Sequence, residues 1–233
     1  MPTKIVTVSC LTIVFSLWSS GALVQNTEPE VKRLERHASL YKHLDTGAPY
    51  NQRKPDANRT VDLSVETLYD YPGSPNPPDP RAELQTLTKL FPLIVETRAG
   101  RSVSALTERR SFIHSDWTFT VVKVFKNTTS ISVNPDSELS VSRPGGTMDI
   151  DGLHLVAHDR NTPPVKMGGT YILMLKQLDD GSFQSSAYGT FEIVDNKVSY
   201  LTDPYNKTTS LRAYCTHNSA KAFSDLLTEV LKP

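Results

Sequence analysis

Short segments in which apolar residues recur at every second position fill the middle of the chain, and this pattern constrains the fold more than any other feature. The clearest is 116–125, where Trp117 and Phe119 lie on one face of the expected strand. Turn residues separate the segments, as at Asp151-Gly152 between two apolar runs. We expect further strands at 93–99, 138–142, 148–150, 153–157, 170–178, 183–194 and 197–201. Sequential hairpins with glycine-rich corners predict a mainly β fold, a small antiparallel barrel or sandwich.

Helical periodicity flanks the strands on both sides. Residues 81–91 place leucines and a phenylalanine on one face, and Asp79 stands where a helix cap is expected. Residues 219–232 carry one apolar stripe that must pack against another element. We therefore predict a β domain over 81–205 with a helix before it, and a C-terminal amphipathic helix within 206–233 that packs on it.

The first residues have the pattern of a secretory signal peptide. Lys4 supplies a positive start, 5–18 is mostly apolar, and Ser20 and Ala22 are the small residues of a cleavage site. The apolar run is shorter than the roughly 20 residues that span a bilayer, and no later segment is long and apolar enough to do so. We predict a cleaved signal peptide over 1–22 and an exported protein, either periplasmic or secreted.

A polar, proline-rich stretch follows the predicted signal peptide. Residues 28–44 have the spacing of a marginal helix, and five prolines fall within 71–80. A segment with many prolines and few apolar residues favours an extended conformation over a packed core. We predict a disordered arm or linker over 23–80.

Composition excludes several classes of protein. Lys plus Arg number 25 and Asp plus Glu number 25, so the formal net charge is zero, whereas nucleic-acid binders normally carry a basic surplus. The chain has two cysteines, too few for a disulfide framework or a cysteine zinc site. Removal of 1–22 leaves only Cys215, which we interpret as a small buried apolar residue. No cofactor-binding loop is present, and we predict no cofactor.

Several motifs together resemble a family of uncharacterised exported bacterial proteins of the kind common in acidobacterial genomes. They are SVSALTE at 102–108, DWTFTVVKVFK at 116–126, VSRPGGT at 141–147, KMGGTYILML at 166–175 and GTFEI at 189–193. The resemblance covers about residues 80–201. It implies export and the β architecture, and it implies no particular activity.

The same motifs are more distantly similar to netrin-like modules, which are OB-type barrels that include metalloproteinase inhibitors. The shared features are a strand that leads to a lysine-containing turn, and a later strand in which a glycine is followed by Tyr-Leu. This similarity implies an OB/netrin-like barrel. It does not imply inhibition, because those inhibitors depend on an N-terminal cysteine held by disulfides, and this region has none.

His154, His158 and Asp159 are the candidate metal ligands. On a strand, residues four apart are separated by about 13 Å, too far for two ligands of one zinc ion. A bend near Asp159 would be needed to bring the two histidines together. We therefore favour solvent-facing polar residues and predict no metal site.

His114, Ser115 and Asp116 supply the side-chain types of a hydrolase triad. Neighbouring residues on a strand point to opposite faces, and the chain has no Gly-x-Ser-x-Gly motif, so we do not predict a serine hydrolase. Asp179 and Asp180 are interpreted as turn residues.

Arg143, in an Arg-Pro-Gly-Gly motif, is the most distinctive candidate for binding. Gly145 and Gly146 have backbone amides that, beside Arg143, suit a carboxylate or a phosphate. The alternative, which we favour, is that the glycines turn a barrel corner and Arg143 is a solvated charge at a strand edge. Trp117 is a second binding candidate, although aromatic residues at this spacing are more often in the core.

These features lead to three functional hypotheses. The first is a non-enzymatic binding or interaction module of the cell envelope or extracellular space, whose partner is an unknown protein or envelope component. The second is an inhibitor or regulator of an extracellular hydrolase, by the netrin-like resemblance. The third is a metal-dependent hydrolase that uses His154, His158 and Asp159.

Overall fold

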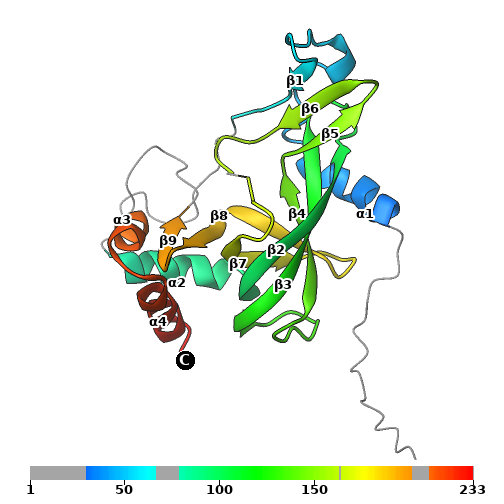
Figure 1. Cartoon of the computed structure of the whole chain (residues 1–233). Coiled ribbons are helices and arrows are strands. Elements are labelled where there is room, and N and C mark those ends of the chain that lie inside the picture. Colours follow the sequence, from blue (N-terminus) through cyan, green and yellow to red (C-terminus); the bar gives the residue numbers. More distant parts are fainter. Residues whose placement is uncertain (1–29, 67–78, 163, 201–209, 233) are drawn as a thin grey trace, which may run out of the picture.

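The computed structural model of the chain describes residues 30–66, 79–162, 164–200 and 210–232 (Figure 1). The predicted signal peptide over 1–22 lies outside the described residues, as do 23–29 and 67–78 of the predicted arm. No helix within the described ranges has the length and apolar character needed to cross a membrane.

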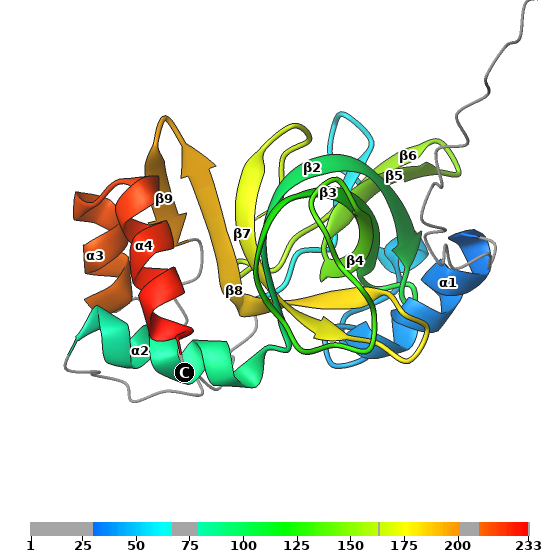
Figure 2. The same cartoon turned by 90° about the horizontal axis from the view of Figure 1, so that it is seen from below.

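Five strands form a closed barrel, which Figure 2 views from below. They are β2 (Leu93–Leu106), β3 (Ile113–Asn127), β4 (Glu138–Pro144), β7 (Thr170–Gln177) and β8 (Phe183–Val194). Neighbours in the order β4-β3-β2-β7-β8 pair antiparallel, and a short parallel pairing of β4 with β8, from Val141↔Phe183 to Ser142↔Gln184, closes the ring. The structure therefore confirms the predicted mainly β fold. Of the two predicted architectures, barrel and sandwich, the protein has the barrel.

A small three-stranded sheet stands at one end of the barrel (Figure 1). It consists of β1 (Thr60–Asp62), β6 (Leu153–Ala157) and β5 (Gly146–Ile150), in that order. The hairpin between β5 and β6 turns at Asp151 and Gly152, whose φ angles of 52° and 70° are those that a two-residue hairpin loop requires. This hairpin was predicted; β1, which pairs parallel to β6, was not.

Three helices pack against β7, β8 and β9 (Lys197–Tyr200), a strand that pairs with β8 outside the five-strand ring. They are α2 (Pro80–Leu90), α3 (Ser210–His217) and α4 (Ala220–Val230). The Asp79 side chain caps α2 by accepting a hydrogen bond from the Ala82 amide, as its place in the sequence indicates. Helix α4 matches the predicted amphipathic helix, whereas α3 was not predicted as a separate element.

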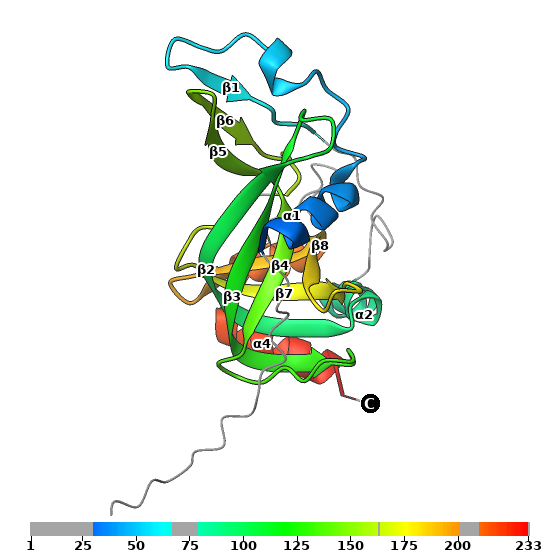
Figure 3. The same cartoon turned by 90° about the vertical axis from the view of Figure 1, so that its right-hand side faces the viewer.

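Residues 30–66, here called the N-terminal segment, fold against the barrel and the small sheet (Figure 3). The segment contains α1 (Glu30–His37), η1 (Ala38–Tyr41), η2 (Tyr50–Gln52) and β1. Its buried apolar side chains are Leu34, Ala38, Tyr41, Leu44, Tyr50, Val61 and Leu63. The prediction of a disordered arm over 23–80 is therefore wrong for 30–66. The helical spacing expected within 28–44 does correspond to α1 and η1. The apolar residues after 44 have no strict period, and their partners, such as Phe112 and Leu155, are distant in sequence.

Candidate functional site

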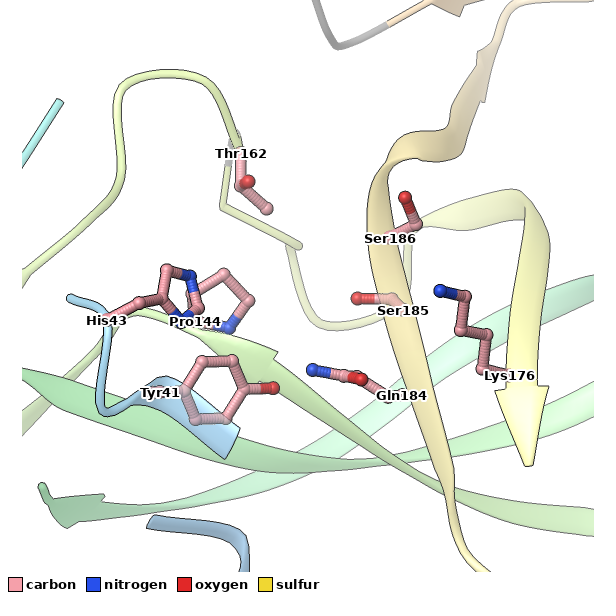
Figure 4. A pocket seen from close by; sticks show the side chains of 8 residues that line it. All are labelled: Tyr41, His43, Pro144, Thr162, Lys176, Gln184, Ser185 and Ser186. Atoms are coloured by element: carbon pink, nitrogen blue, oxygen red, sulfur yellow. The ribbon is translucent and has the colours of Figure 1, made fainter. Parts of the chain in front are cut away.

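A cavity of about 160 Å³, here called the seam cavity, opens where β4 and β8 close the barrel. The N-terminal segment forms one wall, and β7 and β8 form the opposite wall (Figure 4). The lining residues are Tyr41, His43, Pro144, Thr162, Lys176, Gln184, Ser185 and Ser186. Two segments far apart in sequence thus build the site together.

The cavity exists because β8 departs from regular pairing beside it. Leu175 of β7 pairs with Ser185, but the next pair in the register is Leu173 with Thr190. The extra residues of β8 between these pairs include Ser186, which lines the cavity. An irregularity of this kind breaks the ladder locally and redirects side chains, which is why bulges are frequent near binding sites.

Arg143 lies directly behind the seam cavity and is only 2% exposed. Its Nη1 atom donates hydrogen bonds to Ser185 Oγ and to Thr190 Oγ1, both at 3.0 Å. The interpretation of Arg143 as a solvated edge charge is therefore wrong. A buried guanidinium needs hydrogen-bond acceptors, and the irregular part of β8 supplies two hydroxyl groups.

Gly145 and Gly146 turn the chain from the barrel into the small sheet. Their φ angles are +89° and +151°, and a side chain at Gly146 would collide with the Ser115 hydroxyl. The Gly145 amide donates to the Ile113 carbonyl at 2.8 Å, and Gly146 pairs with Ala157 in the small sheet. The two glycines serve as a corner, as favoured from the sequence, and the Gly145 amide is already hydrogen-bonded.

A second cavity brings several sequence candidates together but is small. Trp117, Arg143, Gly145, Gly146 and His158 all contribute to its lining, and its volume is about 40 Å³. This volume holds about one water molecule. Trp117 is half-buried and stacks at a tilt against the core residue Phe119, with 6.3 Å between ring centroids, so it serves packing.

The structure does not bring the candidate metal ligands together. His154 Nδ1 lies 2.8 Å from Asp149 Oδ1, and His158 Nδ1 lies 2.7 Å from Ser64 Oγ. Asp159 is buried and accepts a hydrogen bond from the Thr162 hydroxyl. Within the described ranges, no three His, Cys, Asp or Glu side chains are close enough to share a metal ion.

His37, Asp116 and Asp180 form a buried group, here called the charge cluster, beside the seam cavity. His37 Nδ1 is 2.8 Å from Asp116 Oδ1, and its Nε2 is 3.0 Å from Asp180 Oδ2. Each ring nitrogen thus lies within hydrogen-bond distance of a carboxylate, and Nε2 also lies 3.0 Å from Ser182 Oγ. Arg33 adds a hydrogen bond from Nε to Asp116 at 3.0 Å. The cluster fixes α1 to β3 and to the loop between β7 and β8.

The charges in this cluster determine how its carboxylates titrate. Burial alone would raise the pKa of Asp116, but the hydrogen bonds and charge of His37, with Arg33, hold that pKa below its usual value. Burial would also raise the pKa of Asp180, and hydrogen bonds from Ser182 together with His37 lower it instead. Both groups are therefore carboxylates at neutral pH.

Sequence reasoning missed this cluster. His37 falls in the predicted disordered arm, Asp180 was interpreted as a turn residue, and Asp116 was considered only beside its chain neighbours. The contacts join residues 79 and 143 positions apart, and no local pattern connects them.

No protein-family model and no curated protein sequence matches this chain.

Proposed function

We propose that the protein is a non-enzymatic, exported binding module that holds a small ligand in the seam cavity. The observation that carries this proposal is the lining of the cavity: every lining residue except Pro144 has a polar side-chain atom. A concave site with convergent polar groups is the usual form of a ligand site. The ligand is either a free small molecule or a group presented by an envelope component.

The position of α1 also supports the seam cavity as the site. OB-type barrels commonly bind ligands on the face of their second and third strands, between two particular loops. The corresponding elements here are β3, β4 and the loops at 107–112 and 178–182. Helix α1 covers this face and is held there by the charge cluster, as Figure 3 shows. The seam cavity beside α1 is therefore the part of this region that a ligand can still reach.

The hydroxyl groups around the cavity favour binding over catalysis. Ser185 Oγ accepts a hydrogen bond from the Arg143 guanidinium, a donor, whereas an activated nucleophile needs a neighbouring base. Burial raises the pKa of Tyr41, which keeps its phenol protonated. The inhibitor hypothesis rests on the barrel fold alone, and the metal-dependent hydrolase requires ligands that the described structure holds apart.

Filling the cavity tests the proposal. We would screen the mature chain against small polar molecules by thermal shift and measure any hit by calorimetry. Ser186→Phe places a ring in the cavity, and Ser199→Phe places one on the exposed face of β9 as the matched control. We expect a ligand that binds the wild type and Ser199→Phe but loses at least tenfold in affinity for Ser186→Phe. Equal binding to all three proteins would overturn the proposal.

A further inference from the structure

We infer that the ligand of the seam cavity is a small oxyanion, a carboxylate or a phosphate, that also carries a hydroxyl group. This inference rests on the proposed function, since it names the chemical class for the same cavity. It follows from the charges around the cavity, from the direction in which its hydrogen-bonding groups point, and from its volume.

The wall formed by β7 and β8 carries the positive charge. The Lys176 side chain lines the cavity, and the described residues provide no carboxylate that pairs with it (Figure 4). The buried Arg143 guanidinium lies behind this wall and donates a hydrogen bond to Ser185, which lines the cavity. No Asp or Glu is among the lining residues. The two cations of this wall favour an anionic ligand there, because the nearby carboxylates of Asp159 and Asp116 lie behind the opposite wall.

The hydroxyl groups of this wall are oriented as donors. Ser185 Oγ accepts from Arg143, so its own proton is directed to another acceptor, and its oxygen points into the cavity in Figure 4. Ser186 Oγ accepts from the Tyr188 amide and keeps its proton in the same way. Together with Lys176, this wall presents donors to an oxyanion.

The opposite wall presents an acceptor. The Tyr41 hydroxyl donates to Ser142 Oγ at 3.2 Å, and the Thr162 hydroxyl donates to Asp159 Oδ2 at 3.3 Å. The Tyr41 oxygen also meets the Gln184 side chain, whereas the Thr162 oxygen, whose proton is engaged, offers a lone pair to a ligand. A hydroxyl group on the ligand satisfies this acceptor, whereas a second anionic group is repelled. Asp159 lies behind Thr162 and is itself hydrogen-bonded.

The volume limits the size of the ligand. About 160 Å³ corresponds to roughly five water molecules at about 30 Å³ each. Pockets for drug-sized ligands start at about 300 Å³. A short hydroxycarboxylate or a phosphate monoester head fits this volume.

Four probes separate the contribution of the negative charge to binding from that of the hydroxyl group. They are lactate, propionate, propane-1,2-diol and glycerol phosphate, titrated into the mature wild-type chain by calorimetry. We expect lactate or glycerol phosphate to bind most tightly, propionate more weakly and the diol not at all. Which of the two anions binds distinguishes a carboxylate from a phosphate ligand.

Lys176→Met and Lys197→Met form the matched pair of variants, since both lysines are exposed and only Lys176 lines the cavity. We expect Lys176→Met to weaken anion binding by about tenfold and Lys197→Met to leave it unchanged. Binding of the diol as tight as that of lactate, with no effect of Lys176→Met, would overturn the oxyanion inference and leave the cavity as a binding site. Absence of binding by every probe overturns the inference. The proposed function fails as well only if no other ligand in the screen responds to Ser186→Phe.

Discussion

The N-terminal segment and the C-terminal helices both cover the barrel, but different forces attach them. Helices α3 and α4 bury mainly apolar side chains such as Phe223 and Leu227 against β8, β9 and α2, with one buried carboxylate, Glu83 of α2, at the start of α3. The N-terminal segment also buries apolar groups, yet its contacts with the barrel strands and loops include buried charges. Asp45 accepts hydrogen bonds from Thr107, Arg109 and Ser111, and His37 joins two carboxylates.

The attachment of the C-terminal helices depends on no single pair of groups, whereas that of the N-terminal segment depends on particular charged partners. Apolar packing tolerates repacking and is nearly insensitive to pH. Buried charges are stable only with each partner in place, and they fail when one partner is removed or protonated. The predictions below test this contrast, beginning with the largest expected effect.

Phe223→Ala should destabilise the whole protein by about 3–5 kcal/mol, because it empties a fully buried site in contact with Phe191. Urea unfolding followed by circular dichroism measures the change. Thr228→Ala, on the exposed face of α4, is the control and should stay within about 0.5 kcal/mol of the wild type. A loss below about 1 kcal/mol for Phe223→Ala would show that α4 contributes little to the core.

His37→Ala should cost about 2–3 kcal/mol, because it leaves Asp116 and Asp180 without the hydrogen-bonding partner that they share. Part of the loss should appear as local opening of α1, measured by hydrogen exchange of 30–41 against 210–230. His154→Ala removes an exposed histidine from its Asp149 contact and serves as the matched control. Equal protection of α1 in His37→Ala and wild type would contradict a role of the charge cluster in holding the segment.

Acid should release the N-terminal segment before the C-terminal helices. The pKa values of Asp45, Asp116 and Asp180 are all lowered in the folded protein, because hydrogen bonds outweigh the effect of burial in each case. The stability that these carboxylates contribute is present above their unfolded pKa of about 4. This stability is lost as the pH falls through the lower pKa values that these carboxyl groups have in the folded protein. Pepsin digestion between pH 4 and pH 2 should cut 30–66 first; simultaneous cutting at both ends would contradict the contrast.

Cys215 should show the smallest effect, an absence of reactivity at neutral pH. Burial, with a contribution from Glu83, raises the pKa of this thiol to about 12. We expect a thiol reagent at pH 8 to modify it only after addition of denaturant. Rapid modification of the native protein would show that α3 opens readily and that apolar packing holds it less firmly than proposed.

The same contrast explains what the sequence could predict. The two-residue period located strands that the structure contains, and one apolar stripe located α4, because both patterns reflect burial within a single element. The Asp79 cap is equally local. Docking of α1 depends on His37 meeting Asp116 and Asp180, contacts that no local pattern encodes.

The candidate site was less predictable than the fold. The Arg-Pro-Gly-Gly motif directed attention to Arg143, which does lie beside the cavity, but its burial depends on hydroxyl groups 42 and 47 residues later. Lys176 and Ser186 carry no motif at all. They become neighbours of Tyr41 only because β8 leaves its regular pairing at that point.

The parallel pairing of β4 with β8 covers only Val141↔Phe183 and Ser142↔Gln184, and it has a kinetic consequence. The hairpins β2–β3 and β7–β8 join strands that follow one another in sequence. The ring also needs the pairing of β2 with β7, as at Leu93↔Leu175, and that of β4 with β8, and both enclose much longer loops that must first lose their freedom. Closure of the ring is therefore a late event on the folding pathway. Since the seam cavity forms only on closure, ligand uptake by a refolding chain should follow the slowest phase, and the ligand should slow unfolding without accelerating folding.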